Sequence, residues 1–73
     1  MKIKIECDLD SWTVEVPEDM TVEKLTEKAK KYFILKSGEY ELRLKQSGSP
    51  LSIPEKVKNC VFSGTILVLK KIK

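Results

Sequence analysis

The most informative stretch of this chain is Met20-Thr21-Val22-Glu23-Lys24-Leu25, which has the pattern of a helix start. Thr21 can serve as the N-cap, because its hydroxyl can accept a hydrogen bond from a free amide of the first turn. Apolar residues then recur at spacings of three and four. They predict a helix whose buried face holds Val22, Leu25, Ala29 and Tyr32 or Phe33. Ser37 and Gly38 form the predicted helix-exit turn.

Two alternating segments precede this helix and predict a hairpin. In residues 2–7, Ile3, Ile5 and Cys7 alternate with charged residues, so one face of the strand is apolar. Residues 12–16 alternate in the same way, and Pro17, which has no amide hydrogen to donate, is expected to end this second strand. The link between the two segments is short, which favours antiparallel pairing.

Three further elements are predicted after the helix. Residues 40–45 alternate as a third strand, and Leu51 begins a very short edge strand. Residues 53–57 read as one helical turn, with Pro54 near the first position, where a missing amide costs little. Residues 65–70 are apolar on both faces, which is typical of a central strand between two neighbours.

Composition indicates one globular domain over residues 1–73, with 41% hydrophobic and 34% charged residues. No apolar run approaches the ~20 residues that a membrane span needs, so no membrane association is expected. The N-terminus has no signal-peptide pattern, which predicts a cytoplasmic location, or a nuclear one in a eukaryote. Cys7 and Cys60 are expected to be reduced thiols, with Cys7 turned toward the core and unreactive.

The order of these segments resembles the ubiquitin superfamily across nearly the whole chain. Residues 20–25 resemble the helix start of ubiquitin, where a Thr cap is followed by Ile-Glu-x-Val. Residues 42–51 resemble its third strand, Gly-containing turn and short fourth strand, and residues 58–69 resemble its final segment. The resemblance implies an α+β, ubiquitin-like β-grasp fold. In that fold a mixed sheet of four to five strands packs on one α-helix, in the order ββαβ(β), short helix, β.

One departure from that family concerns its tail. Conjugated modifiers and sulfur carriers of this fold end in Gly-Gly, whereas this sequence ends Leu69-Lys70-Lys71-Ile72-Lys73. As it stands, the chain is therefore expected to take part in neither conjugation nor sulfur transfer, and a longer precursor with a diglycine tail would reopen both. Small bacterial ubiquitin-like proteins that lack diglycine and assist secretion machinery have a similar length and blunt end.

Catalysis, metal binding and cofactor binding are not expected. The chain has two cysteines and no histidine, whereas a β-grasp iron–sulfur site needs four cysteines and a zinc site three or four suitable ligands. Cys60 has no histidine base to activate it. The acidic pairs Asp8 with Asp10 and Glu18 with Asp19 fall in turns, where such residues usually solubilise or cap. These observations predict that the chain is not an enzyme.

The candidate site is the outer face of the predicted sheet, with Lys4, Arg43, Lys45, Leu67 and Leu69 as protein-binding residues. If Ile66 and Val68 point to the helix, the strand pleat sends the two leucines outward. In ubiquitin the matching face is the main docking patch, and the register puts the leucines where its last strand has His and Val. The simpler interpretation is that these leucines only support the strand or touch another part of a larger protein.

Such a patch predicts a protein partner with an apolar anchor and an acidic rim. The alternative is a nucleic-acid-binding module that uses the basic sheet face, since residues 56–73 carry five lysines and no acid. The small number of aromatic residues available for base stacking on this face counts against this alternative. A third possibility is a modifier whose diglycine tail is missing. The exposed leucines predict a monomer or a weak dimer.

Overall fold

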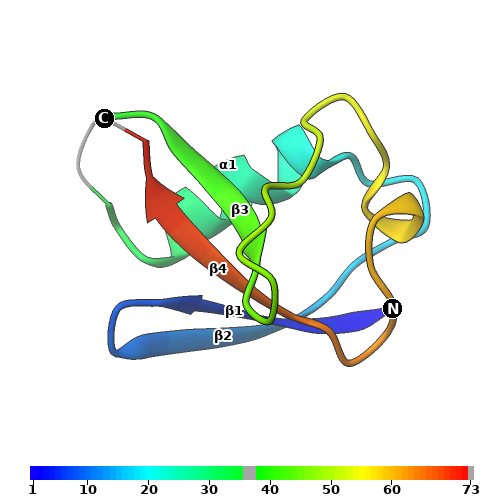
Figure 1. The fold of residues 1–73 in the computed structure, drawn as a ribbon, viewed down its shortest axis with the longest axis horizontal. Coiled ribbons are helices and arrows are strands. Elements are labelled where there is room, and N and C mark those ends of the chain that lie inside the picture. Colours follow the sequence, from blue (N-terminus) through cyan, green and yellow to red (C-terminus); the bar gives the residue numbers. More distant parts are fainter. Residues whose placement is uncertain (36–37, 73) are drawn as a thin grey trace.

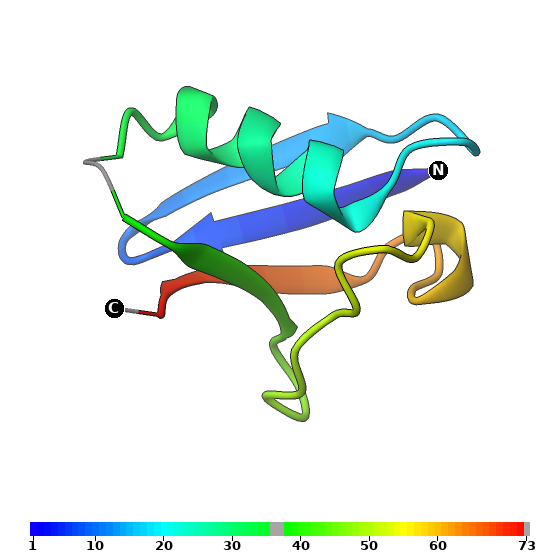
Figure 2. The same ribbon diagram turned by 90° about the horizontal axis from the view of Figure 1, so that it is seen from above.

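The computed structural model describes residues 1–35 and 38–72, and in them one α-helix packs across one face of a four-stranded sheet (Figure 1). The opposite face of the sheet carries no helix in this part of the chain (Figure 2). The elements follow in the order β1 (Lys2–Cys7), β2 (Asp10–Glu15), α1 (Val22–Tyr32), β3 (Tyr40–Leu44), the 3₁₀-helix η1 (Val57–Asn59) and β4 (Ile66–Lys71).

The sheet is mixed, with the strand order β2-β1-β4-β3. β1 pairs antiparallel with β2 and parallel with β4, and β3 pairs antiparallel with β4. The predicted hairpin and the predicted central position of the last strand are therefore confirmed. The fifth strand is not: among the described residues Pro50 forms only an isolated bridge with Arg43, and the Leu51 amide donates to the Leu42 carbonyl oxygen at 2.9 Å.

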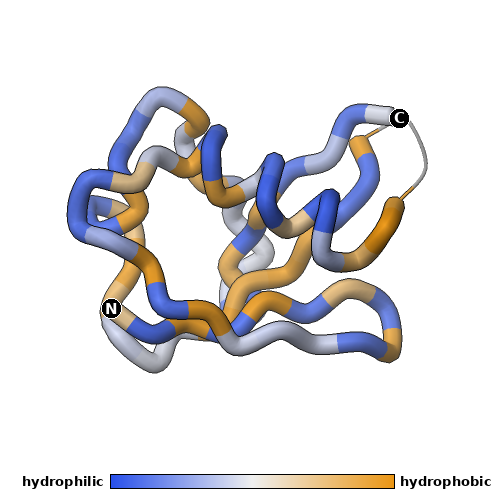
Figure 3. The backbone as a smooth tube through the Cα atoms, turned by 180° about the vertical axis from the view of Figure 1, so that it is seen from behind, coloured by the Kyte–Doolittle hydropathy of each residue, from blue (hydrophilic) through white to orange (hydrophobic). Residues whose placement is uncertain are grey.

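The helix begins as predicted. The Thr21 hydroxyl accepts a hydrogen bond from the Lys24 amide at 3.2 Å, and the buried side of α1 is formed by Val22, Leu25 and Ala29. Hydrophilic and hydrophobic stretches alternate along this helix (Figure 3), as a one-sided apolar stripe requires.

The helical turn predicted at residues 53–57 lies further along the chain, at η1. Lys56 is still extended and forms an isolated bridge with Thr21. The Val22 amide donates to the Glu55 carbonyl oxygen, and the Val57 amide to the Met20 carbonyl oxygen, each at 2.9 Å. Residues 53–54 form a turn closed by the Glu55 amide, which donates to the Ser52 carbonyl oxygen at 3.2 Å, but the bonds to the start of α1 hold Lys56 extended, so the 3₁₀-helix begins only at Val57.

The predicted orientation of the last strand is wrong. Leu67 and Leu69 are buried, at 0% and 4% exposure, whereas Ile66 is 37% exposed and Val68 is half-buried. Ile66 and Val68 were expected in the core and the two leucines on the outer face, and the structure has the reverse.

Strand register explains this reversal. Leu67 lies opposite the buried Ile5 of β1, and Leu69 lies opposite the buried Leu42 of β3. Residues directly opposite in neighbouring strands share a face of the sheet, so both leucines join the helix side. The resulting core consists of Ile3, Ile5, Cys7, Val16, Val22, Leu25, Ala29, Leu42, Val57, Val61, Leu67 and Leu69.

An aromatic stack lies at the edge of this core. Trp12 of β2 stacks on Tyr32 at the end of α1, with ring centroids 4.6 Å apart and planes 10° from parallel. Phe33 meets the Tyr32 ring edge-on at 5.2 Å. Trp12 and Phe33 are half-buried beside the core, whereas Tyr32, the alternative to Phe33 on the predicted buried face, is 53% exposed.

The helix ends at Tyr32, before the predicted exit turn, whose Ser37 lies outside the described residues. The Leu35 amide donates to the Lys30 carbonyl oxygen and the Ile34 amide to that of Lys31, which is the Schellman pattern. Ile34 has φ of 52°, in the left-handed region that favours glycine. A β-branched residue is strained there, and its side chain is 88% exposed.

The orientation of β4 predicts unequal costs for two adjacent truncations. Leu67→Ala should destabilise the fold by about 2–5 kcal/mol, because it leaves a cavity in the core. Ile66→Ala should cost about 1 kcal/mol or less, since it removes contacts at the surface. Urea unfolding followed by circular dichroism measures both. A larger loss for Ile66→Ala would mean that β4 has the opposite face inward.

The left-handed residue predicts a stabilising substitution. Ile34→Gly should raise the free energy of unfolding by about 0.5–1 kcal/mol, because about 1–2 kcal/mol of backbone strain is relieved and part of it is offset by chain entropy. Guanidinium unfolding measures the change. Ile53→Gly is the control, because Ile53 is also exposed but lacks a positive φ, and it should destabilise. Equal losses of unfolding free energy in both variants would contradict the backbone strain at Ile34.

Candidate functional site

The outer sheet face carries two rows of side chains that cross its central strands. In the first row Ile66 of β4 lies opposite Lys4 of β1, and on its other side the Lys45 amide donates to the Ile66 carbonyl oxygen at 3.1 Å. In the second row Val68 lies opposite Glu6 of β1 and Arg43 of β3. We call these six residues the outer-face patch: Lys4, Glu6, Arg43, Lys45, Ile66 and Val68.

The structure brings together three of the five predicted site residues. Lys4, Arg43 and Lys45 lie on the outer face, as the alternation of their strands indicates. Leu67 and Leu69 do not join them, because both are buried on the opposite face of the sheet, which the helix covers. Neither leucine is available to a partner in the folded chain.

Sequence reasoning missed the apolar centre and the acid of this patch. The alternation predicts Ile66 and Val68 toward the helix, and it does not single out Glu6 among the charged residues of β1. The parallel pairing with β1 was the missing information, because it places Val68 beside Glu6 and Ile66 beside Lys4. An alternation of charged and apolar residues within a single strand cannot supply a register between distant strands.

Glu6 links the two lysines of the patch. One carboxylate oxygen lies 2.8 Å from Lys45 Nζ, and the other lies 3.8 Å from Lys4 Nζ. The hydrogen bond from Lys45 lowers the pKa of Glu6 below its ordinary value of 4.5, and the charges of Lys45 and Lys4 act in the same direction against partial burial. Two cations around one carboxylate leave this part of the outer-face patch with a surplus of positive charge.

Arg43 is held in place on the other side of Val68. Its guanidinium forms a salt bridge with Glu41, two residues earlier in β3, and Nη1 donates to the Gly48 carbonyl oxygen at 3.1 Å. The side chain therefore lies along the sheet toward the β3 turn and keeps a fixed orientation beside the half-buried Val68. A pre-oriented guanidinium loses less entropy when it meets a carboxylate than a freely rotating one.

The remaining chemistry of the described residues is limited. Burial raises the pKa of the Cys7 thiol, with Asp8 and Asp10 adding to the effect, which fits the predicted low reactivity of Cys7. Both cysteines are free thiols. No group of three or more His, Cys, Asp or Glu residues within residues 1–35 and 38–72 could hold a metal ion. In the same residues, no helix is long and apolar enough to cross a membrane.

The fold and its open, charged face define the chain as a β-grasp domain. No protein-family model and no curated protein matches the sequence. Solved structures match it along its length, among them a de novo designed protein based on ubiquitin, with 25% identity, a TM-score of 0.81 and coverage of 100% of this chain and 89% of that one. By fold, the chain is a ubiquitin-like domain.

Two natural neighbours extend this comparison. One is the N-terminal ubiquitin-like domain of the 4931431F19Rik protein, at 12% identity and a TM-score of 0.80, with 100% of this chain and 75% of that chain covered. The other is a chain of the pParkin–pUb–UbcH7 complex, at 16% identity and a TM-score of 0.82, with 97% of this chain and 22% of that chain covered. At these identities the likeness concerns the fold.

The ion pairs of the patch predict how Glu6 titrates. In the Lys45→Gln variant the Glu6 pKa should rise toward 4.5, because its main hydrogen-bond donor is lost. Carboxyl ¹³C NMR across an acid titration measures this. Lys4→Gln is the matched control and should have a smaller effect, since its nitrogen is the more distant. An unchanged Glu6 pKa in Lys45→Gln would rule out the bond.

The same shift predicts a pH dependence of stability. The Glu6 pKa is lower in the folded chain than in the unfolded chain, so the interaction stabilises the fold above about pH 4.5. That contribution is lost as the pH falls through the folded-state pKa. Urea unfolding at pH 6 and pH 3 should therefore show a smaller acid loss for Lys45→Gln than for the parent chain. Equal losses would contradict the linkage.

Proposed function

We propose that this chain is a non-enzymatic protein-interaction module that docks a partner through the outer-face patch. The observation that carries the proposal is the placement of Ile66 and Val68, two β-branched aliphatic residues, at the centre of an open sheet face. Apolar side chains on a face that water covers stabilise a complex when a partner buries them. Leu67 and Leu69 were predicted to form this apolar centre, and Ile66 and Val68 take their place in the proposal.

The charges around this centre favour a particular kind of partner. Lys4 and Lys45 flank Ile66 and share one carboxylate, and Arg43 lies beside Val68. Lys4 and Lys45 share Glu6 and Arg43 pairs with Glu41, so three cations face two carboxylates. A partner with an aliphatic anchor and carboxylates around it would cover the apolar pair and meet this surplus positive charge. Rim charges of this kind mainly raise the association rate and select among partners.

The fold neighbours lend general support to a protein partner. In the pParkin–pUb–UbcH7 complex, a part that makes up 22% of one chain has the same fold, within an assembly of proteins. A nucleic-acid role is the second candidate from the sequence, and it gains little from the geometry, because Trp12 is stacked on Tyr32 instead of standing free on the outer face. We further propose that the chain as it stands is not conjugated, that it acts in the cytoplasm, or in the nucleus of a eukaryote, and that it is a monomer or a weak dimer.

Quantitative affinity capture from cell lysate tests the proposal. The baits are the parent chain, an Ile66→Glu/Val68→Gln double variant and, as control, Leu9→Glu, whose side chain is 103% exposed at the β1–β2 turn. Partners should be captured by the parent chain and by Leu9→Glu, and lost by roughly tenfold or more in the double variant, because buried interface centres carry most binding energy.

Circular dichroism must show that all three baits are folded. Equal capture by the double variant would refute docking through the patch. Material that is released by nuclease or by moderate salt in all three baits would transfer the assignment to nucleic-acid binding, where phosphate contacts make affinity steeply salt-dependent.

A further inference from the structure

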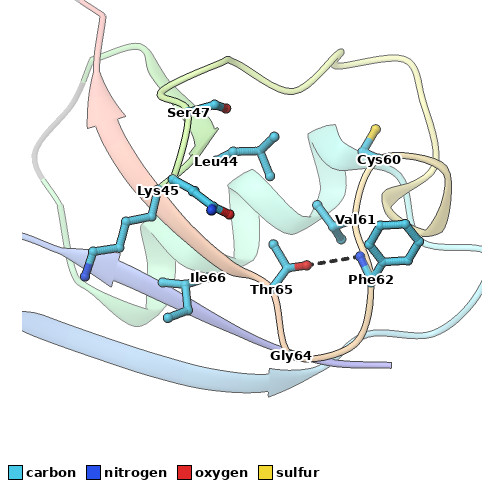
Figure 4. Close-up of a pocket in the computed structure, with 10 residues that line it drawn as sticks. Leu44, Lys45, Ser47, Cys60, Val61, Phe62, Gly64, Thr65 and Ile66 are labelled. Atoms are coloured by element: carbon cyan, nitrogen blue, oxygen red, sulfur yellow. Dashed lines mark hydrogen bonds between the residues drawn. The ribbon is translucent and has the colours of Figure 1, made fainter.

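A groove opens at one end of the sheet, next to the outer-face patch. It has a volume of about 820 Å³, within the range of small-ligand pockets. One wall is formed by the end of β3 and its turn, including Leu44 and Lys45, and the other by residues 60–62. Figure 4 shows Leu44 on one side and Val61 and Phe62 on the other, with Thr65 between them.

Hydrogen bonds fix both walls of the groove. The Phe62 amide donates to Thr65 Oγ1 and the Thr65 amide to the Phe62 carbonyl oxygen, each at 3.1 Å (Figure 4 shows the first of these). The Gly64 amide donates to the Lys2 carbonyl oxygen at 2.7 Å, which ties this loop to β1. Across the groove, the Leu44 amide donates to the Ser49 carbonyl oxygen at 2.9 Å. A groove held open before binding costs a ligand less entropy than one that must form.

The groove is apolar and exposed at the same time. Phe62 is 85% exposed although it is one of the largest apolar side chains of the chain, and Ile66 at the opposite rim is 37% exposed. Nothing in the described part of the chain covers the Phe62 ring. An apolar side chain bound in this groove would contact both the exposed aromatic ring and the apolar floor beside it.

The charge around the groove has one sign. Lys45 lines it, and Lys4 lies opposite Ile66 at its rim. Glu6 forms ion pairs with both of these lysines. None of the ten described residues that line the groove is acidic.

We infer that this groove is the specificity pocket for a linear acidic peptide, which inserts one large apolar side chain between Leu44 and Phe62 and sets its carboxylates against Lys45 and Lys4. Such a peptide segment of the partner would serve the protein-interaction function proposed above, on which this inference rests. The groove selects the anchor residue, and the lysines select the acidic flanks. Ile66 belongs both to the groove and to the outer-face patch, so a peptide seated in the groove continues onto the sheet face.

Selection from a displayed library of random short peptides on the folded chain tests this. Enriched peptides should share one large apolar residue flanked by Asp or Glu. They are then made synthetically and titrated by fluorescence anisotropy, with a matched peptide in which the anchor is Ala. Loss of the anchor should weaken binding by roughly tenfold or more, and added salt should weaken it further.

Two variants and one label localise the binding. Gln46→Trp places a bulky ring at the groove, Phe62→Ala removes one wall, and both residues are exposed, so the fold should tolerate either change. Both variants should lose the peptide, whereas the control Gln46→Ala should keep it. Bound peptide should also slow maleimide labelling of Cys60, a half-buried thiol of the groove, relative to the free chain.

The outcomes separate this inference from the proposed function. Suppose that peptides bind Gln46→Trp and the parent chain equally but fail to bind the Ile66→Glu/Val68→Gln variant. This result would refute peptide binding in the groove and would leave docking through the sheet face intact. An absence of enrichment, or enrichment of basic peptides, would overturn the inference, while lysate capture would still decide the proposed function. A concentration-dependent dimer that Phe62→Ala dissociates would show that the groove binds a second copy of the chain, and it would refute the inference of a peptide ligand.

Discussion

The insertion of β4 between β1 and β3 is the contact on which the rest of the structure depends. It joins the N-terminal hairpin to β3, and it brings Leu67 and Leu69 against Ile5 and Leu42 to complete the core under α1. The same register fixes what appears on the opposite face, because the pleat turns Ile66 and Val68 outward whenever the leucines turn inward. The core and the candidate docking surface are therefore two results of one strand pairing.

Local patterns were enough to predict much of the fold. The helix start followed from a capping threonine and an apolar period, and the structure shows both the Thr21 hydrogen bond and the buried face. Alternation located β1, β2 and β3 to within a few residues. Two predictions failed where a distant partner overrides local preference: the start of α1 holds Lys56 extended, which delays the 3₁₀-helix to Val57, and Leu51 bonds to β3 without extending the ladder.

The candidate site was less predictable, for a reason visible in residues 66–69. All four are apolar, so a period of two is consistent with either pair facing the helix. The alternating strands β1 and β3 had no such ambiguity, and Lys4, Arg43 and Lys45 were placed on the correct face. Choosing the phase of β4 requires its pairing with β1, across some sixty residues of sequence. Predicting the groove requires, in addition, the positions of the turn after β3 and of the loop before β4.

The stack of Trp12 on Tyr32 bears on how the molecule can be observed. Trp12 is the one tryptophan of the sequence, and it sits where the edge strand β2 meets the end of α1. Its emission should therefore follow the docking of helix on sheet, and so report folding. The groove lies beyond β1, beside β3 and β4, so its occupancy should leave this fluorophore unchanged. The fluorescence of Trp12 therefore reports whether the domain is folded and does not report whether the groove is occupied.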